Sequence, residues 1–371
     1  MERKTINLPL HGGKCPKWLY GKMKKLAKPI TATIIEEKGQ EEFLRKLSDP
    51  TWFQSLSCAL GYDWHSSGVT TVTTAALRES LNEQNKGIAV CGGKGKTSRK
   101  TPQQIIEKAK KLEVKPSKAE ELKLKSRLSA KIDSNCLQDQ HTLYHHTFFF
   151  TEKGEWTVIQ QGMKEQDKKG YARRYHWYSP ENTIEEPHEG ISTQEKTKTL
   201  DLTSKKSKKT RKISVDLVKD GEQIEKYFRP KGQKTLNKEQ PPNLIEQTKK
   251  EKTLSPRHEV KMSPQIKKAL NKAEEIQPKD YKELVQIEGI GKKTLRALAL
   301  ISDLIYNEKP SFEDPATYSF AHGGKDGYPY PVNKKRYNET TKTLEKTIEQ
   351  SEINKKEKRK ALKKLSKNLK Q

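Results

Sequence analysis

The pattern of hydrophobic and polar positions predicts several helices in the first part of the chain. Residues 16–28 and 40–47 have the spacing of two short helices, and an Asp-Pro pair at 49–50 ends the second. Residues 51–60 are mostly apolar and predict a buried helix. The secondary structure of residues 69–76 is ambiguous, because their β-branched side chains favour a strand while the Ala and Leu residues that follow favour a helix.

Strands and further helices follow. Residues 87–91 predict a short strand that leads through a glycine-rich loop to a helix, with Thr101 as N-cap and Pro102 in its first turn. Residues 103–132 continue with helical spacing. The segments 147–151 and 156–160 flank Glu-Lys-Gly-Glu and predict a β-hairpin, to which 170–178 adds a third strand.

Changes in composition divide the rest of the chain. We expect an α+β protein, in which a mixed principal domain is followed by a basic low-complexity connector, a helical unit with a Gly/Pro/aromatic extension, and a basic tail that is either helical or disordered. The predicted boundaries of these four parts are 1–185, 186–258, 259–335 and 336–371.

Charge is the most informative part of the composition. Lys and Arg number 75 against 48 Asp and Glu, which gives a net charge of +27 over 371 residues and points to a polyanionic partner. The four cysteines have no paired metal-ligand spacing, and no apolar run is long enough for a signal peptide or a membrane span. We therefore expect reduced thiols and a cytoplasmic protein that binds DNA.

The clearest motif lies in the helical unit. Residues 281–305 read as a short helix, a tight turn and a longer helix, with apolar positions at helical spacing on both sides of the turn. They resemble the helix-hairpin-helix motif of DNA repair proteins, nucleases and polymerases, which binds duplex backbone without sequence preference. The resemblance implies that a helix N-terminus and adjacent cations hold a phosphate. The predicted DNA-binding residues of this motif are Gly289, Gly291, Lys292, Lys293 and Thr294.

Two features of this motif leave its reading open. An ordinary helical turn with a glycine C-cap would have much the same local sequence. In addition, Glu288 places a negative charge inside the hairpin, which would be tolerable for DNA binding only if the side chain points away from the DNA.

A second candidate site combines an acid and an imidazole. Asp63 and His65 can project the same way from an extended loop, and together they could hold Mg²⁺ or Mn²⁺ and move a proton during phosphodiester cleavage. The alternative is an Asx-type turn in which His65 is hydrogen-bonded inside the loop.

A third candidate is the glycine-rich loop at 92–99. Its backbone amides, with Lys94, Lys96 and Arg99, could cradle a nucleic-acid phosphate, although a plain flexible loop fits equally well. The loop lacks the spacing of a Walker A motif, so no ATPase activity is expected.

Polar side chains also gather on the predicted strands. We expect Glu155 and His176 to contribute to a catalytic site, and Arg173 and Arg174 to contact DNA. Hydrogen-bonded core residues are the alternative. His141 and His145 have the spacing of a helical metal pair, but no zincin glutamate accompanies them. The stretch 318–331 mixes aromatic residues, glycines, His322, Lys325 and Asp326 and could complete a site.

Several of these segments together resemble a prokaryotic family catalogued as domain of unknown function 763. The motifs that carry the resemblance are Leu-Pro-Leu-His-Gly-Gly at 8–13 and the segments 61–71, 92–99, 172–177 and 319–327. It covers almost the whole chain, and its name implies no activity.

The leading hypothesis is therefore a DNA-binding protein that acts as a divalent-metal-dependent nuclease in DNA repair or processing. The competing hypothesis is a non-catalytic DNA-binding or architectural protein. RNA modification or processing is a third class, disfavoured by the duplex preference of the hairpin motif.

Overall fold

The fold has an antiparallel sheet at its centre. The computed structural model describes residues 15–61, 67–164, 172–193, 196–220, 263–316, 334–351 and 354–369. The strands are β1 (Ile88–Lys94), β3 (His141–Thr151), β4 (Trp156–Lys164), β5 (Ala172–Tyr178) and β6 (His188–Ser192), in the order β1-β3-β4-β5-β6. All neighbours pair antiparallel. The α+β class, the β3–β4 hairpin and the third strand are confirmed.

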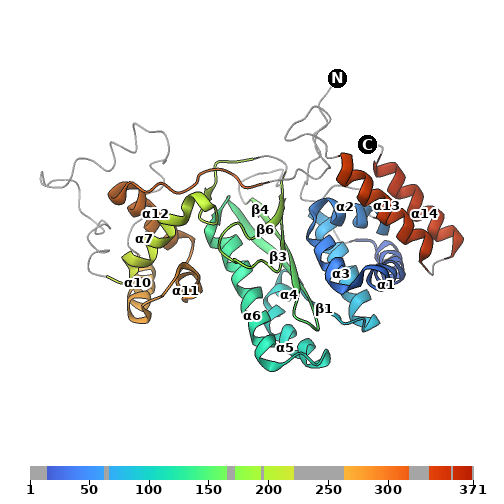
Figure 1. Cartoon of the computed structure of the whole chain (residues 1–371), viewed down its shortest axis with the longest axis horizontal. Helices are drawn as coiled ribbons and strands as arrows, with labels where there is room; N and C mark the ends of the chain where they lie inside the picture. Colours follow the sequence, from blue (N-terminus) through green and yellow to red (C-terminus); the bar gives the residue numbers. More distant parts are fainter. Residues whose placement is uncertain are drawn as a thin grey trace, which may run out of the picture.

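Helices cover both faces of the sheet (Figure 1). One layer holds α1 (Lys17–Ser48), α2 (Pro50–Leu60) and α3 (Ser67–Gln84), and the other holds α5 (Thr101–Lys111) and α6 (Pro116–Lys131). Because side chains alternate along a strand, Phe149 and Ile159 pack with the α1–α3 layer, whereas Phe148 and Val158 pack with α5 and α6. Each face of the sheet therefore has its own core.

Two details of the first layer refine the sequence-based expectation. The two predicted short helices are both present within α1, on either side of a kink at Gly39 where φ is 84° and ψ is 165°, and the first runs on beyond residue 28. The ambiguous segment 69–76 lies in helix α3, where Val69, Thr70, Thr73 and Thr74 are buried. Tertiary packing thus outweighs the β-preference of these residues.

Much of the predicted connector is folded. Beyond β6 it contains β7 (Leu200–Asp201), which pairs with β2 (Leu137–Gln138), then η2 (Lys205–Ser207) and α7 (Lys208–Val218). The prediction of a low-complexity connector is wrong for this part, because Val215, Leu217 and Val218 follow the lysines of α7 and are buried. Residues 221–258 lie outside the described residues.

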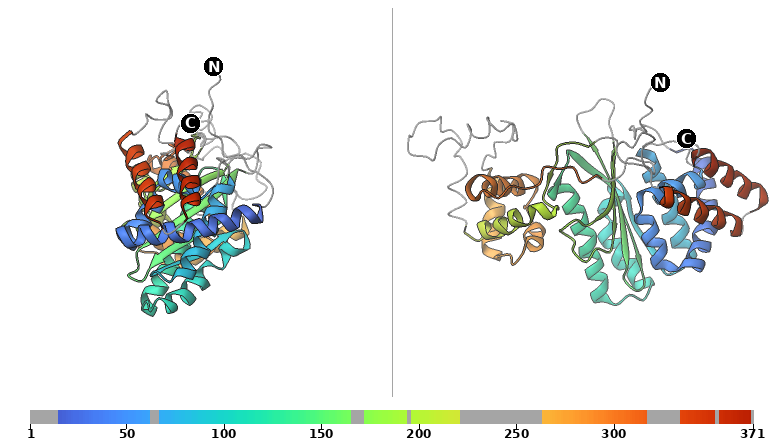
Figure 2. Two further views of the ribbon diagram at one scale, coloured as in Figure 1. Left: turned by 90° about the vertical axis from the view of Figure 1, so that its right-hand side faces the viewer. Right: turned by 45° about the horizontal axis from the view of Figure 1, so that its top comes forward.

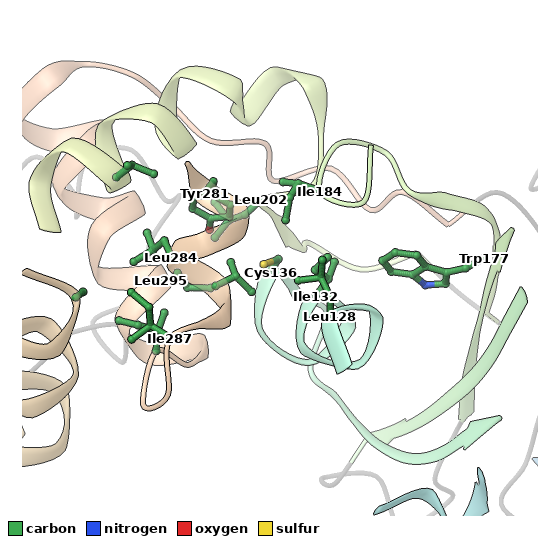
Figure 3. Close-up of a cluster of buried hydrophobic side chains, with 14 of the residues drawn as sticks. Leu128, Ile132, Cys136, Trp177, Ile184, Leu202, Tyr281, Leu284, Ile287 and Leu295 are labelled. Carbon is green, nitrogen blue, oxygen red and sulfur yellow. The ribbon is translucent and has the colours of Figure 1, made fainter. Parts of the chain in front are cut away.

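The helical unit consists of α7, α10 (Pro264–Ile276), α11 (Tyr281–Gln286) and α12 (Lys292–Tyr306). It packs on the end of α6 and on η1 (Ile132–Cys136), so that its core continues into that of the α5–α6 layer. Figure 3 shows Cys136 at this junction, between Tyr281, Leu284 and Leu295 on one side and Leu128 and Ile132 on the other.

The C-terminal segment forms two helices, α13 (Lys334–Gln350) and α14 (Lys355–Leu369). They pack against α1 and α2, where Leu344, Ile348 and Ala361 join the core. This end of the molecule lies opposite the helical unit in Figure 1 and in the right-hand view of Figure 2. Of the two alternatives for the basic tail, the structure therefore shows the helical one, docked on the N-terminal layer.

No helix in the described part of the chain is both long enough and apolar enough to cross a membrane.

Candidate nucleic-acid interface

The turn between α11 and α12 has a backbone that requires glycine at one position. Within this hairpin turn, residues 287–291, the amide of Ile290 donates to the carbonyl of Ile287 over 3.3 Å. Gly289 has φ 89°, and a Cβ atom there would lie 3.0 Å from the Cβ of Ala269 in α10. Both the left-handed conformation and the close approach to α10 exclude a larger residue.

A lysine from the adjacent layer holds the turn in place. The Lys131 ammonium group in α6 donates to the carbonyl oxygens of Val285, Gln286 and Ile287 over 2.9, 3.0 and 3.1 Å. These are carbonyls at the C-terminal end of α11, where the helix dipole favours a cation. Burial lowers the pKa of Lys131. No local sequence pattern signals this role, because Lys131 is one lysine among many and its partners lie more than 150 positions away.

The N-terminal end of α12 is left open to a ligand. Gly291 is the N-cap and provides no side-chain cap. Within the described chain, no group accepts a hydrogen bond from the amides of Lys292 and Lys293, whose side chains are exposed. Thr294 differs, since its side chain is only 2 % exposed. The exposed amides and two cations form the geometry that binds an anion at a helix N-terminus.

A polar contact with the sheet domain fixes the direction of α12. The Gln138 side chain donates to the carbonyl of Lys292 over 2.8 Å and accepts from Arg296 Nε over 2.7 Å. Together with the Lys131 contact, this ties both sides of the hairpin turn to the rest of the protein. The open helix end is therefore held by contacts on both sides of the turn.

Several lysines lie around the hairpin turn, together with the acidic Glu288. The Glu288 carboxylate accepts from Lys272 over 2.9 Å, and this hydrogen bond lowers the pKa of Glu288. Its charge is thus offset by a lysine of α10. On the neighbouring α6, burial and then the charge of Lys282 lower the pKa of Lys125. Such crowding of cations favours an anionic ligand over this surface.

The cations of the glycine-rich loop lie at the edge of the sheet. Lys94 ends the edge strand β1, and Lys96 and Arg99 lie in α4 (Lys96–Arg99); all three are exposed. The Lys94 ammonium lies 5.7 Å from the centre of the Tyr144 ring. No acidic residue in the described ranges pairs with these three cations, so they remain accessible to a phosphate.

The structure buries Arg173 and Arg174 completely, contrary to their predicted contact with DNA. Arg173 pairs with Asp139 over 3.0 Å and with Asp314, and these partners raise its pKa although burial opposes the shift. Arg174 lies over the ring of Phe53 at 4.7 Å, and burial lowers its pKa to about 9. Adjacent positions on a strand point to opposite faces, and both faces of this sheet are covered.

Glu155 and His176 are not brought together. Glu155 lies at the β3–β4 turn, where its carboxylate accepts from Thr151. His176 pairs with Ile159 further along β4, and its ring contacts the carbonyl of Leu47 and the Phe53 ring. Burial lowers the pKa of His176 far below its usual value. This separation gives no support to a shared catalytic role.

His145 and His146 join the sheet to its two helical layers. His145 Nε2 lies 3.0 Å from the Thr74 hydroxyl of α3, and His146 Nε2 lies 2.9 Å from the Ser126 hydroxyl of α6. Burial lowers their pKa values to about 3 and about 4, so both rings are neutral at pH 7. His141 and His145 lie on a strand, so the helical metal-pair spacing does not apply.

A buried carboxylate that the sequence did not reveal connects the same sheet to η1. Asp133 accepts from Trp177 Nε1 over 3.0 Å and from Gln160 Nε2 over 2.5 Å, and it lies 2.6 Å from His188 Nε2. Burial raises the pKa of Asp133. Because this cluster lies inside the core, it organises the fold and has no access to a macromolecular ligand.

The predicted metal-binding residues Asp63 and His65 lie outside the described residues, as does the stretch 318–331. Within the described ranges, no group of three or more His, Cys, Asp or Glu side chains could hold a metal ion. Mg²⁺ or Mn²⁺ binding therefore stays a prediction from the sequence.

Comparison with known proteins gives one match. A family described as "Protein of unknown function (DUF763)" matches residues 4–332. No curated protein and no solved structure matches the chain significantly.

Proposed function

The chain belongs to the DUF763 family of unknown function, and since that description assigns no activity, we propose from the site itself that the protein binds the DNA backbone through the hairpin turn. In this proposal, residues 281–306 act as a helix-hairpin-helix motif. The amides at the start of α12 and the side chains of Lys292 and Lys293 hold a phosphate, while the lysines around the turn attract the polyanion.

The observation that carries the proposal is the open N-terminus of α12. Helix N-termini are commonly closed by a side chain of the N-cap residue, as Asp280 does here for α11 by accepting from the amide of Glu283 over 2.8 Å. At α12 the corresponding position is Gly291, which offers no such acceptor. An anionic ligand would satisfy the free amides and also neutralise Lys292 and Lys293.

Gly291 supports the same interpretation. Its φ of −130° is accessible to any residue, and a Cβ atom there would meet only the Gly289 carbonyl oxygen at 4.0 Å. The protein itself therefore has no steric need for glycine at this position. Close approach of an external phosphate supplies a reason, because a methyl group beside the free amides would obstruct it.

The test is duplex binding as a function of salt. We expect the Lys292→Gln, Lys293→Gln double variant to lose at least about tenfold in affinity at low salt, and its salt dependence to fall by about two phosphate contacts. The matched control is Lys110→Gln, Lys111→Gln, which neutralises an adjacent exposed pair at the end of α5. Equal effects of the two variants would contradict a specific role for the hairpin turn.

Gly291→Ala separates this site from general charge. The variant keeps all charges and meets no steric conflict inside the protein, so we expect unchanged stability and a several-fold loss of duplex affinity. Unchanged affinity would show that no phosphate approaches this amide closely.

A cleavage assay tests the nuclease hypothesis. The protein and an Asp63→Ala, His65→Ala variant are each incubated with labelled single-stranded, duplex and branched DNA, in the presence of Mg²⁺, Mn²⁺ or chelator. Metal-dependent cleavage that the variant loses, while its DNA binding survives, would support catalysis at that loop. Binding without cleavage under all conditions would favour the architectural alternative.

A further inference from the structure

We propose that α14 is a second binding surface for nucleic-acid backbone, so that one molecule can hold two duplex segments at its opposite ends. This inference deepens the proposed function and rests on it for the first of the two sites. It is carried by the distribution of charge on α14, by the way this helix is docked, and by its distance from the hairpin turn.

Four cations of α14 lie together on one side of the helix. Lys356, Arg359, Lys360 and Lys363, which we term the α14 stripe, are all exposed. At about 100° per residue they fall within roughly 100° of the helix circumference. In the described part of the chain, no acidic group forms an ion pair with any of the four. The stripe is therefore a concentrated surface charge that lacks internal compensation.

The opposite side of α14 is occupied by the protein. Ala361 is 1 % exposed within the core that α14 shares with α1 and α2, and Leu362 packs against the same core. The Lys358 ammonium donates to the carbonyl of Glu349 near the end of α13, which fixes the start of α14 relative to that helix. The stripe is thus held in one orientation, and the described apolar side of the helix is not available for insertion into a lipid surface.

The dimensions of the stripe fit a phosphate backbone. Lys356 and Lys363 are seven residues apart, which corresponds to a rise of about 10 Å. One strand of duplex DNA carries about three phosphates over that length of helix axis. Four exposed cations can therefore contact about three consecutive phosphates without reading any base.

The two surfaces are too far apart for a single local contact. α14 and α12 lie at opposite ends of the molecule, separated by the sheet and both of its helical layers (Figure 1). A short duplex bound at the hairpin turn would therefore leave the α14 stripe free for a second one. The stripe also follows the segment 4–332 that defines the family match, so this second surface is built from a different part of the chain.

The test is a capture assay with two short duplexes, one fixed to beads and one fluorescent, together with anisotropy measurements on a single duplex. We expect the full chain to retain the fluorescent duplex on the beads. The stripe variant, with Lys356, Arg359, Lys360 and Lys363 each changed to Gln, should lose most of this capture. Its single-duplex affinity and salt dependence should change little, because the hairpin turn alone can hold one short duplex.

Matched variants make the result specific. Changing Lys110, Lys111, Lys115 and Lys153 to Gln removes the same charge from exposed positions around the α5–α6 and β3–β4 turns, so that each fourfold variant has a net charge of +23, from +27 less 4. This control should keep the capture. Changing the three lysines of the stripe to Arg keeps the charge and should also keep it, which separates loss of charge from misfolding.

The outcomes for the two sites are distinguishable. This inference would be overturned if the stripe variant captured the second duplex as well as the unaltered chain does. It would also be overturned if the stripe bound phosphatidylserine vesicles more strongly than duplex. Neither result would affect the hairpin turn, which is judged by single-duplex binding of the Lys292→Gln, Lys293→Gln variant. Loss of all binding in the stripe variant alone would instead overturn the proposed function of the hairpin turn.

Discussion

The hairpin turn and α14 are both basic, but they present positive charge in different ways. At the hairpin turn, two lysines flank the free amides of a helix end, and Gly289, Lys131 and Gln138 fix the geometry. At α14, four long side chains project from the flank of a helix that is held by its apolar side and by the hydrogen bond of Lys358 to Glu349. Backbone amides have fixed directions and lysine side chains do not, so we expect the first surface to be selective in geometry and the second to depend on charge.

The largest predicted effect concerns the sheet that connects the two ends. The folded state holds His145 and His146 at pKa values of about 3 and about 4, below the ordinary value of 6.5, so the unfolded chain binds more protons as the pH falls below 6.5. Stability is therefore lost on acidification. At pH 5.0 the two histidines together cost roughly 4 kcal/mol, from 1.5 pH units at about 1.4 kcal/mol per unit for each.

Urea denaturation between pH 7.5 and 5.0 measures this effect. His146→Gln keeps hydrogen-bonding capacity without a titrating ring, and we expect it to remove roughly 2 kcal/mol of the loss of stability at pH 5.0. Because His145 contacts α3 and His146 contacts α6, both ends of the molecule should lose support together. A pH-independent midpoint would contradict the assignment of these rings as buried and neutral.

Gly289→Ala should have the next largest effect. The left-handed backbone and the contact with Ala269 together should destabilise the folded state by about 2 to 4 kcal/mol. Duplex affinity at the hairpin turn should fall at least tenfold, while binding at the α14 stripe is unchanged. Thermal unfolding and anisotropy measure the two quantities, with Gly291→Ala as the control that leaves stability unchanged. Equal stability of the two variants would show that the turn tolerates a side chain at both positions.

Ala361→Asp tests whether docking matters for α14. A carboxylate at this buried position should destabilise the packing of α14 on α2 by about 2 to 3 kcal/mol and increase hydrogen exchange in α14. Capture of a second duplex should weaken, although all four cations of the stripe remain. The matched control is Ser117→Asp, which adds the same charge at an exposed position of α6. Full capture by an undocked α14 would show that charge alone suffices.

The smallest predicted effect is that of Lys131→Met. The variant keeps much of the side-chain volume but removes three hydrogen bonds to the end of α11, which we expect to cost about 1 to 3 kcal/mol. Hydrogen exchange should increase around residues 284–290, and duplex affinity should fall a few-fold because the amides of α12 lose their fixed position. Arg127→Gln, at an exposed site of the same helix, is the control. Unchanged exchange in this region would show that α10 and Gln138 hold the turn without Lys131.

Local sequence signals predicted the parts of the molecule in which neighbouring residues decide the structure. The β3–β4 hairpin follows from two apolar segments on either side of a glycine-containing turn, and the turn at 287–291 follows from two glycines between amphipathic segments. In both cases the backbone conformation depends on residues within a few positions. The excess of cations was likewise readable directly from the composition.

Long-range contacts decided the rest. The sequence predicted Arg173 to be a surface cation, yet it is buried because Asp314, 141 positions away, neutralises it. The lysine-rich segment around α7 was predicted to be a connector, yet its few apolar residues pack against the helical unit. The tail could be helical or disordered by sequence, and α2 supplies the apolar surface that orders it. Sequence thus determined the turns, the strands and the net charge, because these depend on near neighbours and totals. Only the tertiary structure decided which charges are exposed, because burial depends on partners that the sequence does not place side by side.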